Sequence, residues 1–487
     1  MSKYADKAGN VRHYESVLVR RTFRQGGKVR HETLANLSKL PAGAITAIEA
    51  ALKGETLAAA GSEFTVTRAL PHGDVAAVAA MARQLGMPAL LGPAGRSRNL
   101  VLGLIISRIV RPAGKLDTRA WWPDTTLGAD LGIAGASTDE IHAAMDWLVS
   151  RQDAIEKKLA AKHLGPQVNP SKMALFDLSS TWMTGNNCGL AARGHSRDGK
   201  KGLPQINFGL LGDREGRPVA VRAFPGSTAD PTAFTTIAGD LKDTFRLDDL
   251  VMAGDRGMIT TARINALREL NEAGASFGWI TALRNPAIAA LAADDGPLQM
   301  SLFDQQDLVE INHPGCPDER LIACRNPLLA ARRARKRENL LTATETELAK
   351  IAAAAARARR PLQGKDKIAL RAGKAASKYK MARHFDLEIT DDSLTFTRNQ
   401  ENIGTEAALD GVCVIRTSVD AGALSPAGAV QAYKDLAGIE RDFCSIKTDD
   451  LQVRPIRHRL EDRVKARLLI CMLARYLVWH LQKAWRQ

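Results

Sequence analysis

Two aspartates stand where a carboxylate could hold a divalent cation. We expect Asp177 at the end of an apolar strand predicted over 172–178, and Asp255 directly follows a short apolar strand predicted over 250–253. A carboxylate beside a hydrophobic core is costly unless a cation compensates for it. Carboxylates at neighbouring strand ends can share Mg²⁺, and two such ions activate one oxygen and stabilise another at a phosphodiester. Taken singly, each aspartate fits a turn or helix cap better.

A third acid lies far downstream, on a helix predicted over 426–446. Tyr433, Glu440 and Lys447 recur there at steps of seven residues. Seven residues are nearly two helical turns, so the three side chains lie along one face. The acid could complete a metal site, and the lysine could hold a phosphate as a point charge. Considered alone, this helix is better explained as a surface helix of mixed charge.

Together these residues make the sequence resemble the DDE transposases of bacterial insertion sequences. The resemblance is carried by Asp177, by Gly254-Asp255-Arg256-Gly257, and by the spacing of Tyr433, Glu440 and Lys447. The most similar subgroup has a Tyr-x2-Arg-x3-Glu-x6-Lys signature around its catalytic glutamate. The long separation of the second and third acids also resembles this subgroup, which has an insertion domain at that place.

The resemblance covers 170–290 and 400–485, and the sequence departs from the signature at one position. Leu436 occupies the place of the signature arginine. That contact is therefore missing, or Lys434 or Arg441 supplies it.

The resemblance implies an α/β fold with a ribonuclease-H-like mixed sheet flanked by helices. Asp177, Asp255 and Glu440 would be the catalytic residues and would hold two Mg²⁺ ions, for which Mn²⁺ would substitute. The implied reaction is hydrolysis of a phosphodiester at the transposon end, followed by attack of the freed 3′-hydroxyl on target DNA.

The resemblance also implies how DNA is held. The DNA-binding residues it assigns are Tyr433, Lys447, Arg441 and Arg256. The partners would be the terminal inverted repeats and the target DNA, with a homodimer in the synaptic complex. A bacterial, cytoplasmic and nucleoid-associated protein without a membrane partner follows from this.

Two other function classes remain open. One is a ribonuclease-H-like nuclease that lacks strand transfer. The other is an inactive, transposase-derived protein that only binds DNA, which does not account for the three acids.

Composition favours a polyanion partner. The 487 residues carry 68 Lys and Arg against 53 Asp and Glu, a net charge of +15. Such an excess favours nucleic acid first and an anionic membrane surface second, although a merely basic globular protein has the same charge. With 45% hydrophobic residues, the chain is neither wholly disordered nor a small disulfide scaffold. No apolar run approaches the ~20 residues of a spanning helix, and the first ten residues are too polar for a secretory signal.

The six cysteines have no C-x2-C pair, which argues against a structural zinc site. Free thiols in a reducing cytoplasm fit this pattern best.

Local patterns divide the chain into five regions. A basic hairpin with a Gly26-Gly27 turn and a following helix occupy 1–70. A mainly helical, candidate DNA-binding region follows, in which 137–162 reads as one helix. The stretch 126–149 is compatible with a helix-turn-helix, although generic helix packing explains it better.

An insertion follows the first part of the catalytic core, and its stretch 328–380 holds 15 Lys and Arg against four acids. The predicted regions are 1–70, 71–168, 169–284 (first part of the core), 285–420 (insertion) and 421–487 (two closing helices).

Overall fold

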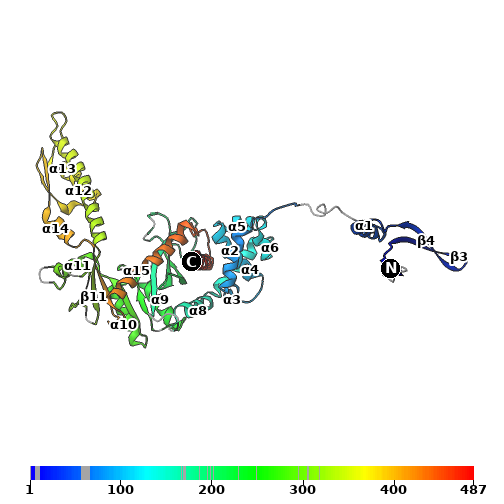
Figure 1. Cartoon of the computed structure of the whole chain (residues 1–487). Coiled ribbons are helices and arrows are strands. Elements are labelled where there is room, and N and C mark those ends of the chain that lie inside the picture. The colour runs from blue at the N-terminus through cyan, green and yellow to red at the C-terminus, as the bar shows by residue number, and fades with distance from the viewer. Residues whose placement is uncertain are drawn as a thin grey trace. The chain divides into compact units, whose positions relative to one another are not determined.

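The chain forms two units, Met1–Leu70 and Pro71–Gln487 (Figure 1). The computed structural model describes residues 2–5, 11–55, 66–165, 167, 172–185, 187–194, 196–197, 199–200, 202–228, 230–247, 249–293, 296–303, 306–316 and 318–486.

The first unit is a set of strands followed by a helix. Its elements are β1 (Ser2–Ala5), β2 (Val11–Tyr14), β3 (Leu18–Gln25), β4 (Lys28–Asn36) and α1 (Ala42–Leu52). Gly26 and Gly27 close the β3–β4 hairpin with φ angles of +56° and +78°, values that glycine adopts without a Cβ clash. The hairpin and helix predicted from the sequence are confirmed.

The second unit begins with a helical region. Its helices are α2 (Gly73–Gln84), α3 (Met87–Leu91), α4 (Arg96–Val110), α5 (Lys115–Trp121), η1 (Trp122–Asp124), α6 (Thr126–Asp130), α7 (Thr138–Val149) and α8 (Gln152–His163). Ser137 and Glu140 form the reciprocal capping box expected at the start of α7. The single helix predicted over 137–162 is wrong, because the chain turns at Ser150 and Arg151. The Ser150 hydroxyl bonds to the Trp147 carbonyl, and Arg151 Nε bonds to the Leu91 carbonyl at 2.6 Å.

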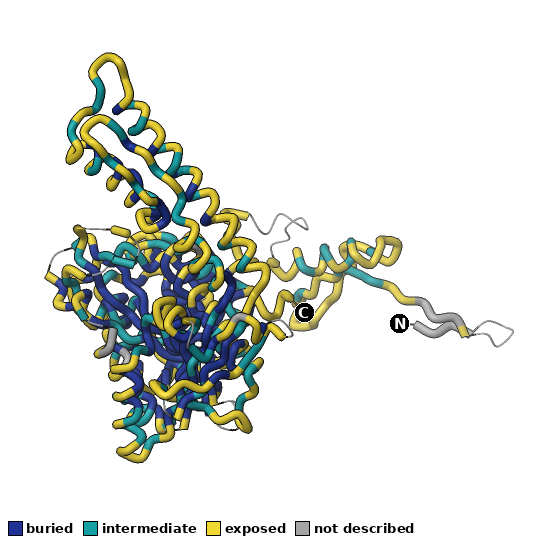
Figure 2. Tube along the Cα trace, turned by 90° about the vertical axis from the view of Figure 1, so that its left-hand side faces the viewer, coloured by how far each residue is buried: buried dark blue, intermediate teal, exposed yellow. Residues whose placement is uncertain are grey.

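An eight-stranded mixed sheet is the centre of the second unit. Its strand order is β10-β11-β14-β9-β8-β5-β6-β7. Strands β5, β6 and β7 are antiparallel to one another, whereas β8 and β9 run parallel to β5. The bounds are β5 (Met173–Trp182), β6 (Gln205–Asp213), β7 (Pro218–Pro225), α9 (Asp230–Asp243), β8 (Val251–Ala253), α10 (Thr261–Glu272) and β9 (Gly278–Ala282). The predicted mixed α/β sheet flanked by helices is thus confirmed. Buried residues concentrate on this sheet and its helices (Figure 2).

The segment expected as an insertion both extends the sheet and leaves it. Its elements are α11 (Asn285–Leu291), η2 (Met300–Phe303), β10 (Leu308–Ile311), β11 (Arg320–Arg325), α12 (Pro327–Ala355), α13 (Lys365–Lys378), η3 (Ala382–His384), β12 (Phe385–Ile389), β13 (Leu394–Arg398), α14 (Gln400–Ala408) and β14 (Val412–Thr417). Strands β10, β11 and β14 join the sheet.

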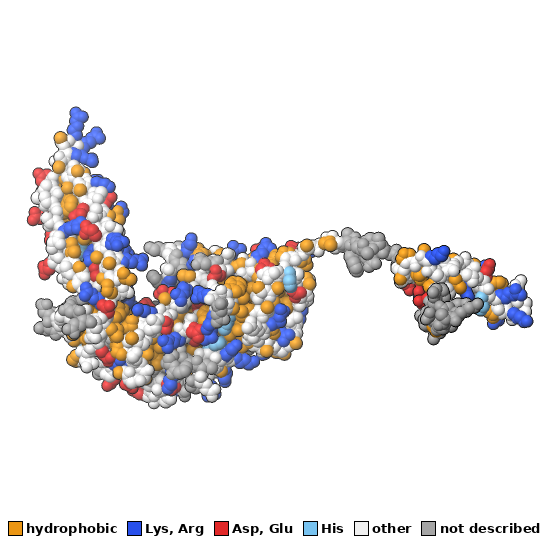
Figure 3. Space-filling model, in the orientation of Figure 1, with side chains coloured by type: hydrophobic (Ala, Val, Ile, Leu, Met, Phe, Trp, Pro, Cys, Tyr) orange, Lys and Arg blue, Asp and Glu red, His pale blue; other side chains and the backbone are white. Residues whose placement is uncertain are grey.

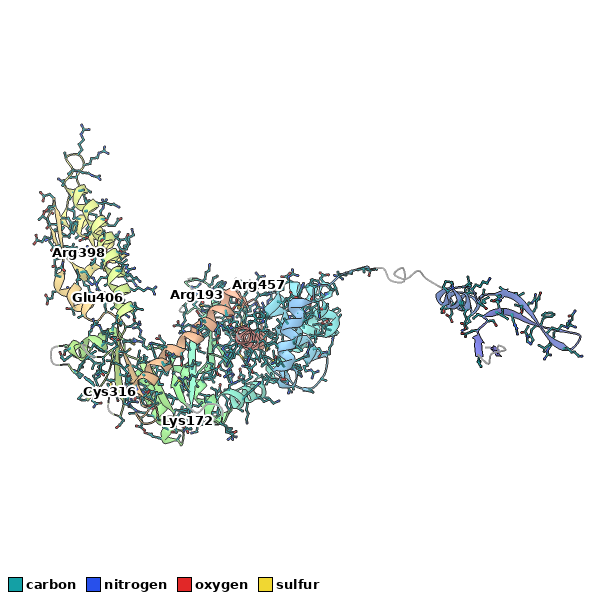
Figure 4. All side chains as sticks on the ribbon, viewed as in Figure 1. Lys172, Arg193, Cys316, Arg398, Glu406 and Arg457 are labelled. Carbon is teal, nitrogen blue, oxygen red and sulfur yellow. The ribbon has the colours of Figure 1, made fainter. Side chains whose placement is uncertain are left out.

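We call residues 327–408 the arm. The arm has a small core of its own, which includes Leu341, Leu348 and Ile368. Arg398, labelled in Figure 4, lies on β13 within the arm. It pairs with both Glu338 and Glu345 and so ties β13 to α12.

Two helices complete the second unit. They are α15 (Pro426–Cys444), which continues into the π-helical turn Ser445–Asp449, and α16 (Glu461–Ala484). Ile439 and Phe443 of α15 belong to the main core, as do most residues of α16. None of the helices in the described part of the chain is long and apolar enough to cross a membrane.

Candidate active site

Asp177 lies in the middle of β5, not at its end. The predicted strand was too short, because β5 continues to Trp182 and stays paired with β6 throughout. The polar residues Ser179, Ser180 and Thr181 hid this continuation in the sequence, yet all three are buried. Asp177 is therefore placed by a central strand of the sheet.

The environment of Asp177 disfavours its negative charge. Burial, with a smaller contribution from the charges of Asp255 and Glu440, raises its pKa to about 6, although the Leu178 backbone N–H and Arg197 oppose the rise. The carboxylate accepts that N–H at 2.7 Å, and Arg197 bonds to the Leu178 carbonyl. Burial and two negative charges nearby thus disfavour the ionised form of Asp177, which a bound cation would favour.

The parallel pairing of β5 and β8 brings Asp255 to the same position along the strand direction as Asp177. The register pairs Leu175 with Ala253, and two further residues along each strand lead to Asp177 and Asp255. Asp255 stands just beyond β8, where the chain leaves the sheet and the side chain is exposed. Gly254 allows this exit, because a Cβ there would lie 2.9 Å from Ile259. The prediction that Asp255 directly follows this strand is confirmed.

Helix α15 carries the remaining residues of the site. The Tyr433 hydroxyl donates a hydrogen bond to Asp255 Oδ1 at 3.2 Å, and burial together with that carboxylate raises the pKa of the tyrosine. Glu440 lies two turns further along α15, is exposed, and contributes its charge to the raised pKa of Asp177. The charges of Asp255 and Glu440, from two other elements, thus both affect the pKa of Asp177 on β5.

The predicted DNA-binding residues differ in their surroundings. Arg256 and Arg441 are exposed, and Arg256 donates to Asn285 Oδ1 at 3.3 Å. Lys447 is only 8% exposed, with its ammonium 5.9 Å from the ring centroid of Phe443. Leu436, at the signature arginine position, packs in the main core. The roles of these residues in DNA binding stay predictions.

One ion pair that holds α15 in place could not be predicted from the sequence. Asp442 and Arg475 of α16 are both buried, and Nε of the arginine lies 2.7 Å from Oδ1 of the aspartate. Asp442 lies two residues after Glu440 and therefore turns away from the acidic face. The two residues are 33 positions apart, on helices that both mix polar and apolar side chains. No periodic pattern in the sequence therefore predicts that they pair.

The acids fit a hard divalent cation in kind. Carboxylate oxygens are the ligands that Mg²⁺ prefers. Burial first, and the charges of Asp255 and Glu440 second, raise the pKa of Asp177, and a bound cation would favour its ionised form. Within the described ranges, however, His, Cys, Asp and Glu form no group of three or more that is close enough to hold a metal ion. A shared cation would therefore have to draw the three carboxylates closer together.

Comparisons with known proteins give one family match. Residues 5–63 match the family described as IS1634 family transposase, N-terminal domain, which supports an insertion-sequence transposase. Among solved structures, the chain is similar to one described as "Cryo-EM structure of piggyBac transposase synaptic complex with hairpin DNA", with 9% identity and a TM-score of 0.34, over 82% of this chain and 70% of that one. No curated protein matches the chain.

Proposed function

We propose that this protein is a DDE transposase that cleaves DNA at the ends of an insertion sequence and transfers the freed 3′-hydroxyl into target DNA. The observation that carries the proposal is geometric: the β5–β8 register aligns Asp177 with Asp255, and a hydrogen bond from Tyr433 ties the helix that carries Glu440 to Asp255. The family match over 5–63 supports the same class from a separate part of the chain.

The sheet topology supports a ribonuclease-H-like core. Three antiparallel strands, β5 to β7, are followed by a helix, a parallel strand, a second helix and a second parallel strand. In this order Asp177 lies on β5, an interior strand, and Asp255 follows the adjacent strand β8. A glutamate from a later helix then completes the acidic face.

We propose Mg²⁺ as the cofactor, held by Asp177, Asp255 and Glu440, with Mn²⁺ as a substitute. When bound, a pair of such ions activates the attacking oxygen and stabilises the leaving oxygen at a phosphodiester. The Tyr433 hydroxyl fixes one oxygen of Asp255, and the Gly257 backbone N–H, at 3.3 Å, fixes the other. These two bonds orient the carboxylate before substrate arrives.

DNA is the proposed partner, with two copies of the chain joining two ends. Arg256 and Arg441 are exposed close to the acids and can neutralise backbone phosphates. Lys and Arg side chains also gather at the tip of the arm and, within the first unit, at the tip of the β3–β4 hairpin (Figure 3). A DNA-bound protein of this kind would act in the cytoplasm, at the nucleoid.

The decisive experiment uses the DNA that flanks the protein's own gene. The purified chain is incubated with this DNA in Mg²⁺ or EDTA, and the ends are mapped at nucleotide resolution. We expect Mg²⁺-dependent cleavage at fixed ends and joining of those 3′-ends to a second DNA. Cleavage without joining would indicate a nuclease, and specific binding without cleavage would indicate an inactive derivative.

A further inference from the structure

Two cysteines face each other across neighbouring strands of the main sheet. Cys324 of β11 and Cys413 of β14 are direct partners in the antiparallel register. Each thiol has the other as its hydrogen-bonding neighbour. Both side chains are partly exposed, so a small molecule can reach them.

The backbone already has the spacing that a disulfide needs. Directly opposed residues of an antiparallel pair have Cα atoms about 4.5–5.5 Å apart. Disulfides span Cα separations of about 4.4–6.8 Å, so no strand has to move. Just beyond the pair, the Asn326 N–H bonds to the Gly411 carbonyl at 3.0 Å, which holds the two strands in register.

The surroundings of the pair favour a reactive thiolate. The interaction with the Cys413 thiol and the charge of Lys434 lower the pKa of Cys324, against the effect of burial. Arg256 and Arg333 act on Cys413 in the same direction, but the Cys324 thiol and then burial raise its pKa. A low-pKa, accessible cysteine beside a second thiol is the arrangement of a thiol that exchanges with disulfides.

The position of the pair gives the bond a structural consequence. β11 leads into α12, and α14 leads back into β14, so Cys324 and Cys413 stand where the chain enters and leaves the arm. Both strands pack beside α15, the helix that carries Tyr433 and Glu440. A disulfide here would covalently join β11 to β14 at the base of the arm, next to the acidic site.

We propose that Cys324 and Cys413 are a reversible disulfide site, oxidised by a low-molecular-weight disulfide of the glutathione type. The Cys324 thiolate attacks one sulfur of the oxidant, forms a mixed disulfide and releases one thiolate. Cys413 then loses its proton, attacks the Cys324 sulfur and displaces the second thiolate. Two cysteine thiols are oxidised and one small disulfide is reduced to two thiols, and dithiothreitol reverses the step. This inference is independent of the proposed function.

The test is a peptide map of the full-length protein. The folded chain is incubated with oxidised glutathione, alkylated with N-ethylmaleimide, digested and analysed by mass spectrometry. We expect one internal cross-link between the Cys324 and Cys413 peptides, which dithiothreitol removes. Cys324→Ser and Cys413→Ser should each abolish the cross-link, whereas Cys444→Ser, which changes an exposed cysteine outside the pair, should leave it intact.

A second readout uses the protein without any substitution. Arg357, Arg359 and Arg360 lie exposed between α12 and α13, so brief trypsin treatment can cut the arm within the loop that the disulfide would close. The two fragments should stay joined on a non-reducing denaturing gel of the oxidised protein and separate after reduction. Fragments that separate in both lanes, or a map in which only glutathione adducts appear, would overturn the proposal.

Discussion

The hydroxyl of Tyr433 lies 3.2 Å from Oδ1 of Asp255, although 178 positions separate the two residues in the chain. This bond joins α15 to the end of β8 and so couples the helix that carries Glu440 to the strand that places Asp255. The two ends of the candidate site are thus aligned through one hydrogen bond.

Removing that hydroxyl should lower activity while the fold is kept. In Tyr433→Phe, the ring still packs but Asp255 loses the donor that fixes its orientation. A hydrogen bond to a charged group contributes about 1.5–3 kcal/mol, so we expect end cleavage about ten- to a hundredfold slower. Initial rates in Mg²⁺ measure this. Tyr379→Phe in the arm is the matched control, and equal rates for the two variants would contradict the assigned role.

The raised pKa of Asp177 predicts a pH-dependent effect on stability. Because the pKa rises from 3.8 to about 6 on folding, the folded state binds the proton more tightly. The ionised side chain is therefore unfavourable above pH 6, and this cost vanishes below about pH 4. In EDTA, Asp177→Asn should stabilise the protein by about 1–2 kcal/mol at pH 7, a value below the full shift because solvent reaches this side chain.

Chemical denaturation at pH 7 and pH 4 measures this difference. The stabilising effect of Asp177→Asn should be present at pH 7 and absent at pH 4. A variant that is less stable than the parent at pH 7 would show that the carboxylate is held by a favourable partner after all.

The buried pair of Asp442 and Arg475 should be required for the placement of α15. Removing one partner leaves the other charge buried, which costs about 3–5 kcal/mol. Asp442→Ala should therefore lower the denaturation midpoint strongly. Asp435→Ala on the same helix breaks a 3.4 Å pair with half-exposed Arg214 and an exposed hydrogen bond from Gln431, so it should cost at most about 1 kcal/mol. Similar midpoints for the two variants would rule out a structural role for the buried pair.

Most elements of the fold could be predicted from local patterns. The Gly26-Gly27 turn, the Ser137 capping box and the helix that carries Tyr433 and Glu440 each follow from short-range chemistry that tertiary contacts left unchanged. Two errors came where contacts from distant parts of the chain decided the local structure. β5 runs on through buried hydroxyl residues after Asp177, and a predicted single helix breaks at Arg151, which bonds across to Leu91.

The pairing of distant residues could not be predicted in the same way. Nothing in the sequence reveals that Cys324 opposes Cys413, because strand register depends on which strands become neighbours. The burial of Lys447 was also hidden, since a lysine at helical spacing from Glu440 fits an exposed face equally well.

DNA binding should be strongly salt-dependent. Each phosphate that a basic side chain neutralises releases counterions, so the affinity should fall at least about a hundredfold between 50 and 200 mM salt. Fluorescence anisotropy with labelled end DNA measures this. Replacing Arg357, Arg359 and Arg360 with Ala should reduce the slope if the arm tip contacts phosphates. An affinity that barely changes with salt would exclude a phosphate-dominated interface.

Neutralising any one of the three acids should separate chemistry from binding. Asp177→Asn, Asp255→Asn and Glu440→Gln each keep the side-chain shape and remove one charge from the proposed cation site. The loss of several kcal/mol at the transition state corresponds to a rate at least about a thousandfold lower, since each 1.36 kcal/mol is tenfold. End binding in EDTA should be kept or strengthened, because a less negative site repels phosphate less. Glu461→Gln, at the exposed start of α16, is the matched control and should cleave like the parent. If Glu440→Gln cleaves normally while Glu461→Gln does not, the third acid has been wrongly assigned, and the role given to Tyr433 on the same helix fails with it.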